Sequence, residues 1–350
     1  MVPPVHADRV LEAVRRLAAT PDPGALSDGL SAPMAARCLD LACGLITREA
    51  LLAALDVPGV PPRTAAVVGA RGVFTASLEW VALLAGAGAE VVLKAPAAAP
   101  HFGRALAAAF TAESLPVRCT TDRALPDTEA IVAMGDDASI AAIAATHARA
   151  RLALHGHRTS LALVEAPDPE TLAAALALDT LLYDGRGCFT PAAVLVVGPP
   201  QRAADLAEAL GRALTCLRAD LPLGDLDPLH GPAWRHRTGL ARVLGRLYGT
   251  DAPGAGAAGL LPAAHLDLNV VPGFLAVHSV ASVAEAAGRV RPWLGHLAAC
   301  ATDLADPAQV LPLGVERACR PGRLQTPPFG RTHGGLEPLR MLCAHPSIEP

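Results

Sequence analysis

Apolar residues recur at helical spacing near the start of the chain and later gather into short runs separated by helical segments. Val10, Leu11, Val14 and Leu17 illustrate the first pattern, which predicts helices over residues 8–55, and the Pro-rich residues 57–62 end it. Beyond them, the pattern predicts alternating strands (64–69, 90–94, 116–120, 129–134 and near 152) and helices (75–86, 101–112 and 138–149). Such alternation predicts a parallel sheet covered on both faces, with ligands at the carboxyl ends of its strands.

The alternation continues after residue 151. It predicts strands at 161–164, 193–198, 274–277 and 310–315, and helices at 169–182, 202–218 and 283–290. Residues 220–264 are rich in Gly, Pro and His and contain one clear helical pattern, at 238–248. The fold class is therefore α/β, with a Rossmann-like nucleotide-binding domain and a second α/β domain that begins near Leu182.

Composition fits this organisation and excludes several classes of protein. A length of 350 residues predicts about two domains. Hydrophobic residues make up 52% and charged residues 18%, which excludes intrinsic disorder. The net charge of -4 is spread along the chain and only 3% of residues are aromatic, so neither a cationic face nor a stacking surface for nucleic acid is expected.

The sequence predicts neither a membrane span nor a metal site. Apolar runs such as residues 81–89 end at Glu90, well short of the roughly 20 residues that a spanning helix needs. Residues 1–6 lack the apolar core of a signal peptide, so we expect a cytoplasmic protein. Eight cysteines are scattered along the chain without the spacing of a zinc site.

Lys94 is the only lysine among 29 basic residues. Where a surface charge is all that is needed, arginine serves elsewhere in this chain. A lone lysine is therefore weak evidence for a site that needs a compact ammonium group on a flexible stem. The alternative is that this lysine has remained in the sequence by chance.

Cys188 is the candidate nucleophile. It lies in the segment Gly-Arg-Gly-Cys-Phe-Thr-Pro over residues 185–191, where Gly185 and Gly187 allow a sharp turn that presents the thiol at an exposed junction. Arg186 and free backbone N–H groups after the turn would both favour the thiolate, and the N–H groups could also hold an oxyanion. A structural cysteine is the alternative interpretation.

Three segments in this order resemble the acyl-CoA reductase family of bacterial bioluminescence, a branch of the aldehyde dehydrogenase superfamily. They are residues 184–191, the upstream residues 155–160 (His-Gly-His-Arg-Thr-Ser), and residues 321–328 (Pro-Gly-Arg-Leu-Gln-Thr-Pro-Pro) followed by His-Gly-Gly at 333–335. The resemblance runs from about residue 63 to the end of the chain.

The resemblance implies an aldehyde-dehydrogenase-like fold and NADPH as hydride donor. The domains expected on this basis are an N-terminal helical segment (1–60), an NADPH-binding domain (61–181), a catalytic domain with the nucleophilic cysteine (182–318) and a tail returning to the cofactor domain (319–350). Substrate would be an acyl-CoA or acyl-carrier thioester, and Cys188 would match the acyl-accepting cysteine. Both a homo-oligomer and a complex with a partner subunit are compatible with the sequence.

Lys94 matches the superfamily's Lys-Pro cofactor segment, whose lysine reaches the adenosine ribose or its phosphate. The position also suits a dinucleotide on independent grounds, because it follows a predicted parallel strand. Gly135 and Asp136 resemble the glycine turn beside the cofactor. With Gly69 and Gly72, these residues form the expected cofactor site.

Two departures from the superfamily bear on the chemistry. The asparagine that forms half of its oxyanion hole is expected near Gly72, and none is present there. The loss of one such donor typically costs about 100- to 1000-fold in rate. The glutamate that activates water for hydrolysis is expected near residues 153–155, and it is also missing. A thioester reductase would benefit from the second absence, because activated water would release the acyl group as acid.

Several further residues are candidates for supporting roles. His155 and His157 could assist proton transfer at the thiol, with tight packing around Gly156 as the alternative. Arg158 and Ser160, in the same segment, could hold phosphate or brace the catalytic turn, and Arg186 and Gly187 flank the cysteine. His333 could approach the site from the tail, or belong to a structural turn.

Three functions from different classes follow from these residues. The leading hypothesis is reduction of an acyl thioester to an aldehyde through an acyl-cysteine. The second is a non-catalytic, aldehyde-dehydrogenase-like subunit or binding protein, suggested by the missing asparagine and by an N-terminal part shorter than the family's. The third is a thioesterase or acyltransferase that pairs Cys188 with His157 or His333.

Overall fold

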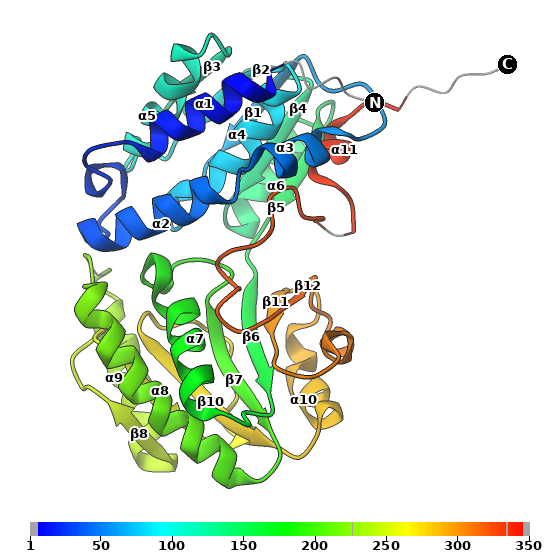
Figure 1. Ribbon diagram of the computed structural model, residues 1–350. Helices are drawn as coiled ribbons and strands as arrows, with labels where there is room; N and C mark the ends of the chain where they lie inside the picture. The colour runs from blue at the N-terminus through cyan, green and yellow to red at the C-terminus, as the bar shows by residue number, and fades with distance from the viewer. Residues whose placement is uncertain (1–5, 226, 334, 346–350) are drawn as a thin grey trace, which may run out of the picture. The chain divides into compact units, whose positions relative to one another are not determined.

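The computed structural model describes residues 6–225, 227–333 and 335–345 and divides the chain into two compact units, each built around its own sheet. Unit 1 comprises residues 1–28, 35–157 and 326–350, and unit 2 comprises residues 29–34 and 158–325. The expected α/β class, with a Rossmann-like part and a second α/β part, is confirmed. Figure 1 traces the chain through both units.

Unit 1 contains a five-stranded parallel sheet in the order β3-β2-β1-β4-β5. Its strands are β1 (Thr64–Val68), β2 (Glu90–Lys94), β3 (Val117–Thr120), β4 (Ala130–Met134) and β5 (Arg151–His155). Its helices are α1 (Ala7–Ala18), α2 (Ala32–Gly44, whose first residues belong to unit 2), α3 (Arg48–Leu55), α4 (Ser77–Gly86), α5 (His101–Ala112), α6 (Asp137–Thr146) and α11 (Pro338–Leu342). The order reverses beside β1, where crossovers leave toward both sides, so the carboxyl ends of β1 and its neighbours form the ligand crevice of such sheets.

Helices cover the sheet of unit 1 on both faces, as the alternation of elements predicts. Val10, Leu11, Val14 and Leu17 of α1 are buried in the larger core, together with residues of α3, α4 and α5. On the other face, Ile140 of α6 packs against a smaller cluster. The helical spacing of apolar residues read from the sequence is thus the buried stripe of α1.

Unit 2 contains a seven-stranded sheet in the order β12-β11-β6-β7-β10-β9-β8, parallel except for the edge strand β8. Its strands are β6 (Thr159–Val164), β7 (Pro191–Val197), β8 (Arg246–Gly249), β9 (Ala257–Leu260), β10 (Phe274–Val280), β11 (Leu297–Ala301) and β12 (Arg317–Cys319). Helices α7 (Pro169–Leu181) and α8 (Pro200–Asp220) pack on one face, and α9 (His230–Leu244) and α10 (Val283–Val290) on the other (Figure 1).

The boundary between the units differs from the one predicted from the sequence. The sequence places the cofactor domain at 61–181, whereas residues 158–181 belong to unit 2. The physical reason is strand pairing, because β6 forms ladders with β7 and β11 and none with β5. The last segment, from residue 326, belongs to unit 1, where the Gly330 amide donates to Glu79 at 2.9 Å.

One predicted element is wrong, and another has different bounds. Residues 310–315 were expected as a strand, but residues Pro307–Leu313 form a 3-10 helix capped by Asp306, in which Val310 and Leu313 point into the core at a spacing of three residues. The helix predicted at 238–248 begins earlier, at His230, and gives way to strand β8 at Arg246. Strands β8, β9, β11 and β12 were not predicted; each is short, and β9 and β11 are rich in alanine, which has little β-propensity.

No helix among the described residues is long and apolar enough to cross a membrane.

The stability of the fold should depend on pH through His278 of β10. Its side chain is fully buried, with Nδ1 3.1 Å from the Leu261 carbonyl oxygen, and burial lowers its pKa to about 4. The unfolded chain binds a proton near pH 6.5, so this group's contribution to stability is present above that pH and is lost as the pH falls toward 4. We expect the wild-type protein to lose about 2 kcal/mol of unfolding free energy between pH 7 and pH 5 from this residue alone.

The measurement is urea unfolding of the wild type and His278→Gln at both pH values. Glutamine does not titrate, so the difference in unfolding free energy between the two proteins should change by that amount. An identical pH dependence in the two proteins would contradict a buried neutral histidine.

Candidate active site

Cys188 is exposed and lies in a tight turn immediately before β7. The Thr190 amide donates to the Gly187 carbonyl oxygen at 3.0 Å, which closes the turn around Cys188 and Phe189. On the other side, the Ser160 hydroxyl donates to the Cys188 carbonyl oxygen at 2.8 Å. Ser160 itself is fully buried in β6, so the backbone of the cysteine is held to the amino-terminal end of the central strands of unit 2.

The other cysteines provide a contrast. Cys38, Cys43, Cys300 and Cys343 are buried. Burial raises the pKa of the Cys43 thiol to about 12 and raises that of Cys300 strongly as well. Such thiols stay protonated near neutral pH and are poor nucleophiles. Among the described residues, Cys216 on α8 is the other exposed cysteine.

The backbone before Cys188 is left-handed over three consecutive residues. Tyr183, Asp184 and Gly185 have φ values of 55°, 52° and 70°. At Gly185 an added Cβ would lie 3.3 Å from the Pro272 Cα and from the Thr180 carbonyl oxygen, so both the space and the torsion favour glycine. For Tyr183 and Asp184 this conformation is uncommon and persists only where surrounding contacts hold it.

Asp184 is fully buried and forms an ion pair with Arg218, at 2.7 Å between Oδ1 and the guanidinium. Its other oxygen accepts from the Gly224 amide at 3.1 Å. Arg186 extends toward the same region, because its guanidinium donates to the Asp225 carbonyl oxygen at 2.6 Å and lies 3.9 Å from the Asp184 carboxylate. Arg186 thus contacts Asp184 and backbone carbonyl oxygens, and its expected role beside the thiol stays a prediction.

A second carboxylate, Asp179 at the end of α7, ties the chain's later residues to the turn. It accepts from the amides of Gly322 and Leu324 at 2.7 and 2.9 Å, and burial raises its pKa to about 7. The Gln325 side chain then donates to the Asp179 carbonyl oxygen and to the Thr190 hydroxyl. Residues 322–325, part of the motif singled out in the sequence at 321–328, thus brace the far side of the cysteine turn.

Sequence reasoning missed Asp179 and Arg218 as parts of this site. Both lie within regular helical patterns that give no local signal. Arg158, which the sequence associates with the same turn, forms an ion pair with Glu316 at 3.9 Å.

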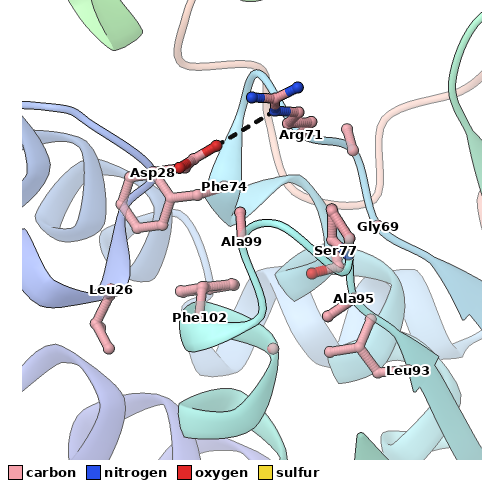
Figure 2. A pocket seen from close by; sticks show the side chains of 13 residues that line it. Leu26, Asp28, Gly69, Arg71, Phe74, Ser77, Leu93, Ala95, Ala99 and Phe102 are labelled. Carbon is pink, nitrogen blue, oxygen red and sulfur yellow. Dashed lines mark hydrogen bonds and ion pairs between the residues drawn. The ribbon is translucent and has the colours of Figure 1, made fainter. Parts of the chain in front are cut away.

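Unit 1 contains a pocket at the carboxyl ends of β1 and β2, close to the first residues of α5. Figure 2 shows Gly69 and Ser77 on one side and Phe102 on another, with the Asp28–Arg71 ion pair (3.3 Å) at the edge. The residues that line it are Leu26, Asp28, Gly69, Ala70, Arg71, Phe74, Ser77, Leu93, Ala95, Pro96, Ala99, Phe102 and Gly103.

The sequence-predicted cofactor residues gather around this end of the sheet in unit 1. Lys94 ends β2 between two residues that line the pocket, and its carbonyl oxygen accepts from the Gly69 amide at 3.0 Å. Gly72 lies in the loop that follows β1. Asp136 caps α6 by accepting from the Ser139 amide at 2.8 Å, which lowers its pKa, and the Gly135 amide donates to the His155 carbonyl oxygen.

These features fit a dinucleotide. The glycine at the end of β1 leaves room for close approach, and the amino-terminal end of α5 beside the pocket presents the positive end of a helix dipole. Lys94 supplies a cation at the end of the adjacent strand. No group of three or more possible metal ligands occurs among the described residues.

The candidate histidines all lie in unit 1. The rings of His155 and His333 are 4.7 Å apart, and each lies 5.2 Å from the Trp80 ring. Burial and the neighbouring Arg331 lower the pKa of His333 to about 2, so this ring stays neutral. His157 is exposed, and its amide donates to Asp137. Gly334, which follows His333 in the motif, lies outside the described residues.

Comparison with known proteins supports the resemblance seen in the sequence. Residues 119–233 match the family model described as acyl-CoA reductase (LuxC). No curated protein sequence matches the chain. Two of the similar solved structures are an oxidoreductase from Marinobacter aquaeolei (TM-score 0.75, 14% identity, 98% of this chain and 85% of that one) and an NAD-dependent aldehyde dehydrogenase from Sinorhizobium meliloti (TM-score 0.70, 15% identity, 91% and 74%).

A third is the indole-3-acetaldehyde dehydrogenase AldA from P. syringae, in complex with NAD+ and IAA (TM-score 0.71, 13% identity, 91% of this chain and 76% of that one). These three likenesses, at 13–15% sequence identity, show a shared fold. The chain therefore has the fold of the aldehyde dehydrogenases, and its residues 119–233, which include Cys188, match the acyl-CoA reductase (LuxC) family.

Proposed function

We propose that the protein reduces an acyl thioester, acyl-CoA or acyl-carrier, to an aldehyde with NADPH, through an acyl group carried on Cys188. The observation that carries this proposal is the exposed thiol of Cys188, held in a closed turn within the segment that matches the acyl-CoA reductase family. Lys94 at the end of β2 and the nearby amino-terminal end of α5 support a nicotinamide dinucleotide as the second substrate.

In this proposal Cys188 carries the covalent step, and the cofactor carries the hydride. The Cys188 thiolate attacks the thioester carbonyl, the new C–S bond forms as the CoA or carrier thiolate leaves, and the acyl group stays on the enzyme. A nicotinamide cofactor bound in unit 1 would supply the hydride that converts the acyl-enzyme to the aldehyde. Hydride addition leaves a thiohemiacetal alkoxide on Cys188; its collapse re-forms the C=O bond, breaks the C–S bond and releases the aldehyde with Cys188 as the thiolate. The proton consumed in the turnover goes to the CoA or carrier thiolate.

The resemblance to aldehyde dehydrogenases places their water-activating glutamate near residues 153–155, and the residues present there support reduction over hydrolysis. Ala153, at the centre of this strand, is buried, and no carboxylate stands in residues 151–155 to activate water. An acyl-enzyme that lacks a general base for water has a longer lifetime for hydride transfer. His333 is also unsuited to act as the general base of a thioesterase, because desolvation and the neighbouring Arg331 lower its pKa to about 2 and make it a weak proton acceptor.

Replacement of the nucleophile tests the proposal directly. Cys188→Ala should lower the rate of aldehyde formation from acyl-CoA and NADPH at least 1000-fold, because the covalent route is lost. Cys216→Ala is the matched control, since Cys216 is also exposed but lies on a helix, and it should retain wild-type activity.

Intact-protein mass spectrometry with a panel of acyl-CoAs should show one acyl adduct on the wild type and none on Cys188→Ala. Aldehyde production by Cys188→Ala would refute the proposal. Binding of NADPH without any adduct on the wild type would favour a non-catalytic subunit, and acid as the product would favour a thioesterase.

Lys94→Ala should separate cofactor binding from acylation. Loss of a charge-assisted hydrogen bond, worth about 1.5–3 kcal/mol, should raise the KM for NADPH by about 10- to 100-fold. The rate at which acyl-CoA acylates Cys188 should stay within twofold, because the ammonium group acts on the other substrate.

Steady-state kinetics with NADPH and with NADH measure this effect, and Arg104→Ala, an exposed cation on α5, is the control. A larger rise in KM for NADPH than for NADH would show that Lys94 contacts the phosphate that distinguishes the two cofactors. An unchanged KM for both would remove Lys94 from the cofactor site.

A further inference from the structure

We infer that Asp184, through its buried ion pair with Arg218, is a positioning residue that fixes the left-handed turn from which Cys188 is presented. The inference deepens the proposed function and rests on Cys188 as the acyl acceptor. It assigns a role to a carboxylate that touches neither the thiol nor any substrate.

The backbone conformation creates the need for such a residue. Three consecutive left-handed residues, 183–185, separate the end of α7 from the cysteine turn, and only the last of them is glycine. Each non-glycine residue in this region costs of order 1 kcal/mol or more, so the segment would relax to another conformation unless it were held.

The Asp184 carboxylate supplies contacts in two directions. Oδ1 pairs with the Arg218 guanidinium at 2.7 Å, and Oδ2 accepts from the Gly224 amide at 3.1 Å. Its side chain is fully buried and that of Arg218 is 6% exposed, so neither group is solvated by water. The carboxylate is therefore fixed by the protein alone.

Arg218 is fixed in turn. Its Nε donates to the Gly254 carbonyl oxygen at 2.9 Å, and its terminal nitrogen lies 3.3 Å from the Leu221 carbonyl oxygen. The ion pair thereby joins the left-handed turn to the end of α8 and to the loop before β9. Three segments far apart in sequence are joined through this one ion pair.

The same carboxylate lies 3.9 Å from Arg186, two residues before the cysteine. Arg186 also donates to the Asp225 carbonyl oxygen, next to the Gly224 amide that Asp184 accepts. Both ends of the segment 184–186 are thus tied to residues 224–225, immediately ahead of Gly187 and Cys188.

Positioning explains this arrangement better than stability does. A buried ion pair contributes little net stability compared with apolar residues of the same size, because both charges must be desolvated. The ion pair instead fixes the orientation of the turn. A displacement of a reacting group by about 1 Å can lower the rate about 100-fold. An ion pair at the base of a strained turn therefore serves the placement of the thiol.

The test is Asp184→Asn, which removes the charge. Asparagine has nearly the same size as aspartate and also tolerates left-handed torsions. We expect kcat for aldehyde formation to fall at least 10-fold, with the KM for acyl-CoA within threefold of the wild type. The rate of alkylation of Cys188 by iodoacetamide, measured relative to Cys216 in the same molecule by peptide mass spectrometry, should fall at least threefold.

Asp303→Asn is the matched control. The Asp303 carboxylate accepts from the Glu165 and Ala166 amides and holds Ala166, another left-handed residue (φ 52°), beyond the opposite end of β6 from Ser160. This variant should lose stability in thermal unfolding but keep the Cys188-to-Cys216 alkylation ratio within twofold. A ratio that falls equally in both variants would show that Asp184 acts only on global stability and would overturn the inference.

The inference and the proposed function fail in different ways. If the wild type forms neither acyl adduct nor aldehyde, the proposed function fails, and the alkylation ratio still reports on the turn. An alkylation ratio in Asp184→Asn that falls less than threefold, or that rises, overturns the inference.

If Asp184→Asn shows no cooperative melting, Arg218→Lys replaces it. Lysine keeps the cation but loses the Nε donation to Gly254, and the same threefold threshold applies to the alkylation ratio of this variant.

Discussion

Between α7 and the candidate nucleophile the chain passes through three left-handed residues, and a buried carboxylate stands at their centre. Because Asp184 is shielded from water, its charge must be balanced by protein groups, and Arg218 and the Gly224 amide supply that balance. The geometry of the turn is therefore coupled to α8 and to the loop after it. The exposure of Cys188 depends on an interaction that is itself hidden from solvent.

A second set of contacts reaches the turn from its other side. Asp179 holds residues 322–324, and Gln325 passes that constraint to Thr190, the residue whose amide closes the turn around Cys188. Ser160 adds a third support from β6. Exposed loops are ordinarily among the more mobile parts of a protein. Here the loop that bears Cys188 is held by β6 through Ser160, and by α7 and residues 322–325 through Gln325.

The sequence was informative wherever local pattern determines structure. The predicted elements at 90–94, 101–112 and 283–290 coincide with β2, α5 and α10, because each combines a clear period with Pro, Gly or capping residues at its ends. The strand predicted at residues 310–315 was wrong because an apolar run that contains Pro312 is compatible with several conformations. The turn at Cys188 had a local signal in its two glycines. Its supports Asp179 and Arg218 had none, since a partner more than 30 residues away is specified only by the folded chain.

Exposure alone does not distinguish Cys188, because Cys216 is exposed as well. The distinction lies in the backbone. Cys216 sits within the regular hydrogen bonding of α8, where the amides on either side of it are engaged by the helix. Cys188 lies in a turn that is held by three separate segments of the chain. Ordering the turn in this way costs conformational entropy, and packing of the core does not require it. A chain that orders its backbone so closely around one accessible thiol has the structure expected of a nucleophile.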